Sequence, residues 1–155
     1  SADTINALCN HEGPIIAVGT TSLRTIESLY WLGIKIMANA DSINLSLQQW
    51  DVYDEQFQKL IFSKKDALHA LLKWMEKKGV NRLFTQTQLL IAPGYECKLA
   101  DGLVTNFHQP KSTLLLLVAA GIGDDWKKCY DYALENDFRF LSYGDGSLLF
   151  FNKSK

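Results

Sequence analysis

The stretch DGLVTNFHQPKST, Asp101 to Thr113, contains the pattern that decides the fold. Apolar residues that fit a strand come first and the polar cluster Thr105 to His108 follows. Pro110 then precedes residues that fit the start of a helix. In α/β proteins, ligands usually bind where polar side chains at the end of a strand face a helix N-terminus. The stretch therefore predicts a fold class and a binding site together.

The rest of the chain alternates in the same way. Apolar spacing predicts helices over Thr4–Asn10, Thr20–Gly33, Ser63–Lys78, Ser112–Gly121 and Trp126–Asn136. Strands are predicted over Ile15–Val18, Gln88–Ala92, within Lys98–Phe107, and over Phe138–Tyr143 and Ser147–Phe151. The last two strands flank Gly144-Asp145-Gly146 as a hairpin. We predict an α/β fold whose mixed, mostly parallel sheet is flanked by helices and ends in a C-terminal β-hairpin.

One region gives a mixed signal. Between Ile34 and Phe57 the apolar alternation at Ile43, Leu45 and Leu47 indicates a strand, whereas the acidic cluster from Asp51 to Glu55 indicates a loop.

Composition limits the function classes. The chain has 155 residues, which suits one domain, and a net charge of −1, so nucleic-acid binding would need a local basic patch. The longest apolar stretch, Leu114–Ile122, is far shorter than the roughly 20 residues that span a bilayer, so we expect no membrane association. Three widely spaced cysteines form no CxxC pair and no metal-ligand set. This indicates a reduced, cytoplasmic setting and no bound metal.

A first site is predicted at the turn after the strand Ile15–Val18. There Thr20 and Thr21 open a helix whose backbone N–H groups suit a phosphate or carboxylate, and Arg24 can add a bidentate contact. Neither the Walker pattern nor the GxGxxG fingerprint is present. The alternative, that these residues only cap the helix, is equally common.

A second site is predicted at Thr105, Asn106 and His108. The amide of Asn106 fits a base or sugar edge, and a histidine has a pKa suited to proton transfer near neutral pH. The alternative is that a buried histidine and asparagine tie the loop to backbone groups.

Two further turns carry polar residues. Lys111 and Ser112 begin a helix and can hold a carboxylate or phosphate, or Ser112 is an ordinary cap. Tyr143 can stack on a base and Asp145 can face a cation, or Asp-Gly is only turn chemistry and Asp145 pairs with Arg139. A basic group on the helix Ser63–Lys78 is better explained as its solvated face than as an RNA contact.

Three segments together resemble the S-adenosylmethionine:tRNA ribosyltransferase-isomerases of queuosine biosynthesis. In the family's order they are GTTSLRT (Gly19 to Thr25), APGYECKLADGLVTNFHQPKSTLLLLVAA (Ala92 to Ala120) and YDYALENDFRFLSYGDGSLLF (Tyr130 to Phe150). The resemblance implies that residues 1–155 are the C-terminal portion of the family's main α/β domain. The N-terminal portion and the inserted β-barrel domain have no counterpart here. Cys97, where an aromatic is common, and Gly146-Ser147, where Ala-Met is usual, depart from the family.

The family's reaction transfers a ribosyl unit from S-adenosylmethionine to the 7-aminomethyl-7-deazaguanine base in tRNA. Isomerisation gives epoxyqueuosine, with release of adenine and methionine. S-adenosylmethionine is then a substrate, and no cofactor is expected. The implied partners are tRNA, S-adenosylmethionine and the missing N-terminal part of the same protein. The chain alone is expected to be inactive and to self-associate through apolar surface.

The family's chemistry leads to a hypothesis for each site residue. We assign catalytic roles to His108 as acid/base, and to Asn106 and Asp145. The substrate-binding residues are predicted to be Thr20, Thr21, Arg24, Thr105, Lys111, Ser112 and Tyr143. Two alternatives remain open, a non-catalytic tRNA- or nucleotide-binding module and a structural domain whose polar turns only cap helices.

Overall fold

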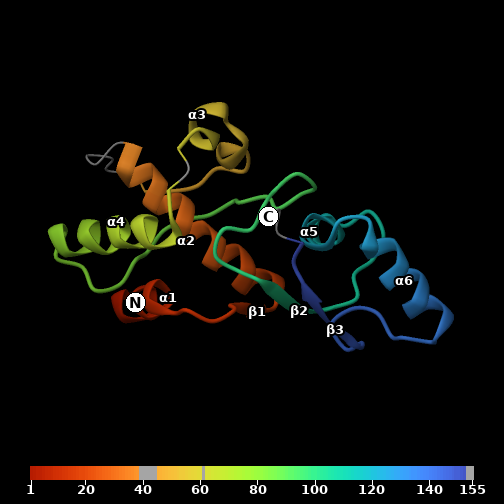
Figure 1. The fold of residues 1–155 in the computed structure, drawn as a ribbon. Coiled ribbons are helices and arrows are strands. Elements are labelled where there is room, and N and C mark those ends of the chain that lie inside the picture. Colours follow the sequence, from red (N-terminus) through yellow and green to blue (C-terminus); the bar gives the residue numbers. More distant parts are fainter. Residues whose placement is uncertain (39–44, 61, 153–155) are drawn as a thin grey trace. The chain divides into compact units, whose positions relative to one another are not determined.

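The computed structural model describes residues 1–38, 45–60 and 62–152, which are drawn in Figure 1. They form two compact units. The first contains Ser1–Gly13 and Thr25–Leu89, and the second contains Pro14–Arg24 and the chain from Leu90 onward. Within the described residues no helix is long and apolar enough to cross a bilayer.

The second unit contains a sheet with strands β1 (Ile16–Val18), β2 (Gly102–Asn106) and β3 (Gly146–Phe150), in the order β1-β2-β3. Strand β1 is parallel to β2, and β3 is antiparallel to β2. The α/β class and the mixed sheet are therefore confirmed. The sheet is not mostly parallel, because one of its two described pairings is of each kind.

Helices α5 (Thr113–Ile122) and α6 (Asp125–Glu135) complete this unit (Figure 1). Ser112 caps α5, which is the alternative that the sequence left open, and its hydroxyl oxygen accepts a hydrogen bond from the backbone N of Leu115 at 3.2 Å. Side chains from both helices meet the sheet in one buried cluster, which consists of Phe107, Val118, Ile122, Tyr130, Ala133 and Leu149. The mostly apolar sequence of α5 is thus explained by burial against β3 and α6.

The predicted C-terminal hairpin is wrong in one arm. Strand β3 pairs with β2, and Phe138–Tyr143 is an irregular segment that ends in a turn instead of a strand. Phe138 and Phe140 pack their rings against Phe107, with centroid distances of 5.5 and 5.4 Å. Their spacing imitates strand alternation, but it arises from this aromatic cluster. Leu141 has a positive φ of 72°, which breaks any extended run.

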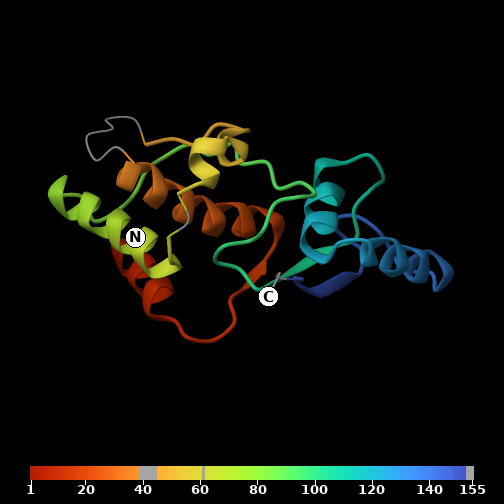
Figure 2. The same ribbon diagram turned by 45° about the horizontal axis from the view of Figure 1, so that its top comes forward.

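The first unit is helical. It contains α1 (Ala2–Asn10), most of α2 (Thr20–Ala38), the 3-10 turn η1 (Asp51–Tyr53), α3 (Glu55–Gln58) and α4 (Lys64–Lys77). Helices α1 and α4 lie side by side in Figures 1 and 2. The prediction for α4 is confirmed at both ends. Ser63 accepts a hydrogen bond from Asp66 N at 3.1 Å, and Gly79 follows with a φ of 66°.

Helix α2 does not end at Gly33 as predicted but continues to Ala38. Gly33 is buried, and a Cβ placed on it would lie 2.1 Å from the backbone oxygen of Ala67 in α4. The glycine therefore allows two helix backbones to approach closely, which is a different role from ending a helix.

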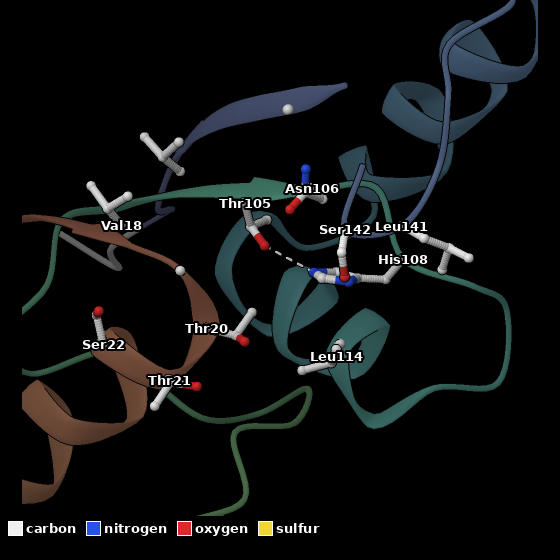
Figure 3. A pocket seen from close by; sticks show the side chains of 13 residues that line it. Val18, Thr20, Thr21, Ser22, Thr105, Asn106, His108, Leu114, Leu141 and Ser142 are labelled. Atoms are coloured by element: carbon white, nitrogen blue, oxygen red, sulfur yellow. Dashed lines mark hydrogen bonds between the residues drawn. The ribbon is translucent and has the colours of Figure 1, made fainter. Parts of the chain in front are cut away.

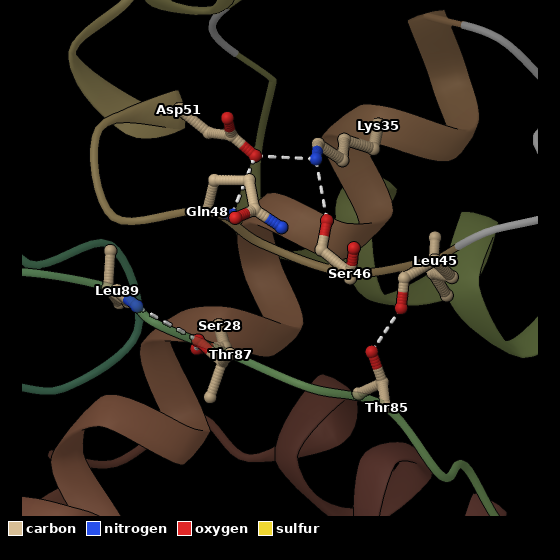
Figure 4. A network of polar contacts seen from close by, with 9 residues as sticks. All are labelled: Ser28, Lys35, Leu45, Ser46, Gln48, Asp51, Thr85, Thr87 and Leu89. Carbon is tan, nitrogen blue, oxygen red and sulfur yellow. Dashed lines mark hydrogen bonds and ion pairs between the residues drawn. The ribbon is translucent and has the colours of Figure 1, made fainter.

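Polar contacts fasten the loops of the first unit (Figure 4). The Lys35 ammonium lies 2.6 Å from Asp51 Oδ2 and also donates to the Ser46 carbonyl at 2.6 Å. Although partial burial acts to raise it, the hydrogen bonds from Lys35 and from Gln48 N hold the pKa of Asp51 below its usual value.

The extended segments of this unit are joined only sparsely. Leu47 and Thr87 form an isolated parallel bridge, and Thr87 shares a hydrogen bond of 2.7 Å with Ser28. Thr85 donates to the Leu45 carbonyl. Gln88–Ala92 is not a strand, which makes that prediction wrong. Within this segment the Leu89 backbone N donates to the nearby Thr87 hydroxyl oxygen at 3.2 Å. The strand signal at Ile43 lies outside the described residues.

Candidate functional site

The main pocket of the second unit lies at the ends of β1 and β2, as the sequence predicted for polar residues after strands (Figure 3). Its volume is about 510 Å³. The residues that line it are Val18, Gly19, Thr20, Thr21, Ser22, Val104, Thr105, Asn106, His108, Leu114, Leu141, Ser142 and Gly146. Segments far apart in the sequence therefore meet around one cavity.

His108 is held from two sides. Its Nε2 lies 2.9 Å from the hydroxyl oxygen of Thr105, and its backbone N donates to the Tyr130 hydroxyl at 3.0 Å. Phe107, the residue before His108, is only 3% exposed and packs in the aromatic cluster. Burial lowers the pKa of His108 from its usual value, so the ring is neutral at neutral pH. A neutral, oriented imidazole can accept a proton, which is what a general base requires.

The lowered pKa makes a prediction about stability. The unfolded chain binds a proton at His108 more tightly than the folded chain does. The stabilisation is therefore present above the unfolded pKa of about 6.5 and is lost as pH falls through the lower folded pKa. We expect the free energy of unfolding to fall between pH 7 and pH 5, and His108→Gln to reduce that slope. Urea unfolding at several pH values measures it, and an unchanged slope in the variant would contradict the assignment.

Asn106 lies on the opposite side of β2 from Thr105, as strand alternation requires (Figure 3). Its amide nitrogen donates to the carbonyl oxygens of Gly144 at 3.3 Å and Asp145 at 3.5 Å. Only glycine fits at position 144 in that turn, because a Cβ there would lie 2.2 Å from the Arg139 carbonyl oxygen. Asn106 therefore ties the end of β2 to the turn before β3 while it lines the pocket.

The turn after β1 forms the opposite wall. Gly19 has a φ of 89°, and its backbone N donates to the Val104 carbonyl at 2.8 Å, which joins the end of β1 to β2. Helix α2 begins at Thr20, so Thr20, Thr21 and Ser22 bring a helix N-terminus and three hydroxyl groups to the pocket. Of these, Ser22 was not among the predicted site residues.

Five of the ten predicted site residues line this pocket, namely Thr20, Thr21, Thr105, Asn106 and His108. Arg24, Lys111, Ser112, Tyr143 and Asp145 do not. Lys111 and Ser112 instead border a separate pocket of about 370 Å³ with Leu116 and Trp126.

Tyr143 and Asp145 lie on the turn before β3. Tyr143 is 97% exposed. The Asp145 carboxylate accepts hydrogen bonds from the Arg139 backbone N at 2.8 Å and from its guanidinium at 3.2 Å. The hydrogen bond from the Arg139 side chain is the main cause of the lowered pKa of Asp145. The pairing of these two residues, which the sequence left open, is confirmed.

Sequence reasoning missed the pocket residue Ser142 and the apolar residues around it. Ser142 lies in the segment that the sequence predicted as the first strand of a hairpin. The hairpin turn favoured Tyr143 and Asp145 as site residues, and Ser142 was not selected. No three His, Cys, Asp or Glu side chains in residues 1–38, 45–60 and 62–152 gather as metal ligands.

Comparison with known proteins decides the family. A family model described as "Queuosine biosynthesis protein" matches residues 1–149. The chain belongs to the queuosine biosynthesis protein family.

Relatives of this family extend beyond the chain. The S-adenosylmethionine:tRNA ribosyltransferase-isomerase of Allorhizobium ampelinum is 35% identical over 151 residues, covering 97% of this chain and 30% of that protein. Its counterpart in Ruegeria pomeroyi is 56% identical over 64 residues, which are 41% of this chain and 18% of that protein. The chain thus spans about 30% of the length of the relatives that match it throughout.

A solved structure supports the fold of this queuosine biosynthesis family member. The crystal structure of S-adenosylmethionine tRNA ribosyltransferase from Thermotoga maritima is similar with a TM-score of 0.58 and 30% sequence identity. The similarity covers 95% of this chain and 38% of that one. The resemblance drawn from the three sequence segments is confirmed.

Proposed function

We propose that this chain is the C-terminal portion of the main α/β domain of a cytoplasmic enzyme that modifies tRNA. The enzyme transfers the ribosyl moiety of S-adenosylmethionine to the 7-aminomethyl-7-deazaguanine base and isomerises it to epoxyqueuosine, releasing adenine and methionine. S-adenosylmethionine is the ribosyl donor and no cofactor takes part. The observation that carries the proposal is the family match over residues 1–149, and the pocket that contains His108 supplies suitable chemistry.

The pocket suits part of this substrate. Its volume of about 510 Å³ lies within the range common for small-molecule sites. In the proposal His108 removes the proton from the carbon next to the sulfonium, and the Thr105 hydroxyl orients its ring. Asn106 contacts the ribose or the deazaguanine. The N-terminus of α2 at Thr20 and Thr21 faces a carboxylate or phosphate, for which exposed N–H groups are well suited.

The remaining predicted residues lie outside this pocket and are proposed to act on more distant parts of the substrates. Lys111 and Ser112 would hold an anionic group in their own pocket. Tyr143 is exposed and available to stack on a base. Asp145 would act mainly by fixing the turn that Asn106 contacts. Arg24 lies on the same helix as Thr20 and Thr21 and would assist at its anion site.

Adenine release from S-adenosylmethionine, with tRNA that carries the precursor base, tests the proposal. The assay compares this chain with a polypeptide of the relatives' full length that contains it, called the full-length enzyme below. We expect release by the full-length enzyme and none by this chain, because about 70% of the relatives' length lies outside the match.

Two outcomes would change the proposal. Turnover by this chain alone would show that it holds a complete site. If neither protein releases adenine but both bind tRNA or a nucleotide, the chain is a binding module and not part of an enzyme.

A further inference from the structure

The sheet of the second unit has one covered side and one uncovered side. Strand alternation directs Ala17, Leu103 and Leu149 to the same side, and all three are at most 6% exposed. Leu149 belongs to the buried cluster that α5 and α6 form. This side is therefore the core side of the sheet.

The other side is also apolar, although it is not buried. Register pairs Val18 with Val104 and Val104 with Leu148, while Ile16 and Phe150 flank Gly102 in the same row. We call the surface formed by Ile16, Val18, Val104, Leu148 and Phe150 the open face. Val18, Leu148 and Phe150 are 69%, 54% and 64% exposed.

The residues of the open face are not typical of a solvent-exposed sheet face. A sheet with one solvated face normally carries polar residues on that face, whereas a sheet covered on both faces is apolar on both. Here the five apolar side chains come from all three strands and form two neighbouring rows across the sheet, one through Val104 and one through Gly102. Scattered exposed apolar residues are ordinary, but a contiguous set marks an interaction surface.

The family comparison indicates what covers it. The chain spans 38% of the Thermotoga maritima protein and 30% of the Allorhizobium ampelinum relative, so most of such a polypeptide lies outside it. We propose that the open face is the docking surface for an apolar layer of the family's polypeptide that this chain does not span. This inference rests on family membership and not on the proposed function.

The docked layer would also complete the pocket. Val18 and Val104 belong both to the open face and to the pocket lining, and Figure 3 shows Val18 among the lining residues. A layer laid over these residues would wall the pocket on that side. Water would then be excluded from the region of Asn106, which strengthens polar contacts to a substrate.

Cysteine labelling tests the docking surface. Leu148→Cys is introduced into this chain and into the full-length enzyme, and maleimide labelling is followed peptide by peptide with mass spectrometry. We expect residue 148 to be labelled at least about tenfold more slowly in the full-length enzyme, because a covered thiol reacts only on local opening. Leu134→Cys, at a residue 67% exposed on α6, is the matched control and is expected to react equally in both.

Equal labelling of residue 148 in both proteins would overturn the proposal. Slow labelling in the full-length enzyme that speeds up on dilution would overturn it too, because a second copy would then be the occupant. Phe150→Asp gives an independent measurement. It is expected to leave the melting temperature of this chain unchanged and to lower that of the full-length enzyme by several degrees, since it would bury an unpaired charge there. An unchanged melting temperature in both would count against docking.

Discussion

Replacing His108 by glutamine in the full-length enzyme is expected to slow adenine release by about 10²–10⁴-fold, the usual contribution of a general base. Glutamine can still share a hydrogen bond with the Thr105 hydroxyl, which lies 2.9 Å from His108 Nε2, but it does not transfer a proton. The effect should fall on the rate of adenine release and leave tRNA binding nearly unchanged. Single-turnover kinetics with labelled S-adenosylmethionine measure it.

A matched control is available on helix α4. His69 is exposed there, so His69→Gln changes the same residue type far from the pocket lining and should leave the rate of adenine release unaltered. Melting curves for both variants separate loss of chemistry from loss of folding. Near-normal adenine release by His108→Gln would remove His108 from the proposed catalytic residues.

Gly33→Ala is expected to destabilise the chain by about 1–3 kcal/mol, the usual cost of overpacking a core. The sign is decided by two opposing effects. Alanine favours a helix over glycine by about 1 kcal/mol, which would stabilise α2 if the site were open. The added Cβ, however, would lie 2.1 Å from the Ala67 carbonyl oxygen. This backbone oxygen can move away only if α2 and α4 separate. We expect this repulsion to be larger.

Urea denaturation of this chain measures the effect of Gly33→Ala. Met37→Ala, at an exposed position of the same helix, serves as the control and should change the free energy of unfolding by less than about 1 kcal/mol. A stability equal to or above that of the unchanged chain would show that the two helices separate at little cost.

Local signals in the sequence predicted much of the fold. Ser63 and Ser112 cap helices where the pattern placed them, since a cap depends only on residues within one turn. The strand before Gly19 and the strand within Lys98–Phe107 were found from short apolar runs. The same logic placed half of the ten predicted site residues at the pocket, because strand ends and helix starts can both be recognised in a sequence.

The errors share one physical cause, which is contact with distant parts of the chain. Gly33 carries a helix-ending residue type, yet its role is set by Ala67 on another helix. Phe138 and Phe140 alternate like a strand because both rings meet Phe107. Ser142 reaches the pocket through a turn in which the Leu141 backbone N donates to the Phe107 carbonyl oxygen at 2.9 Å.

The Tyr130 hydroxyl accepts a hydrogen bond from the His108 backbone N, and Tyr130 belongs to the hydrophobic core. The position of the proposed catalytic histidine therefore depends on residues that do not line the pocket. A genetic screen for inactive enzymes would therefore recover Tyr130 and Phe107 beside His108, although only the histidine faces the cavity. Measuring protein abundance alongside activity sorts such variants, since core changes lower both and a change at the imidazole lowers activity alone.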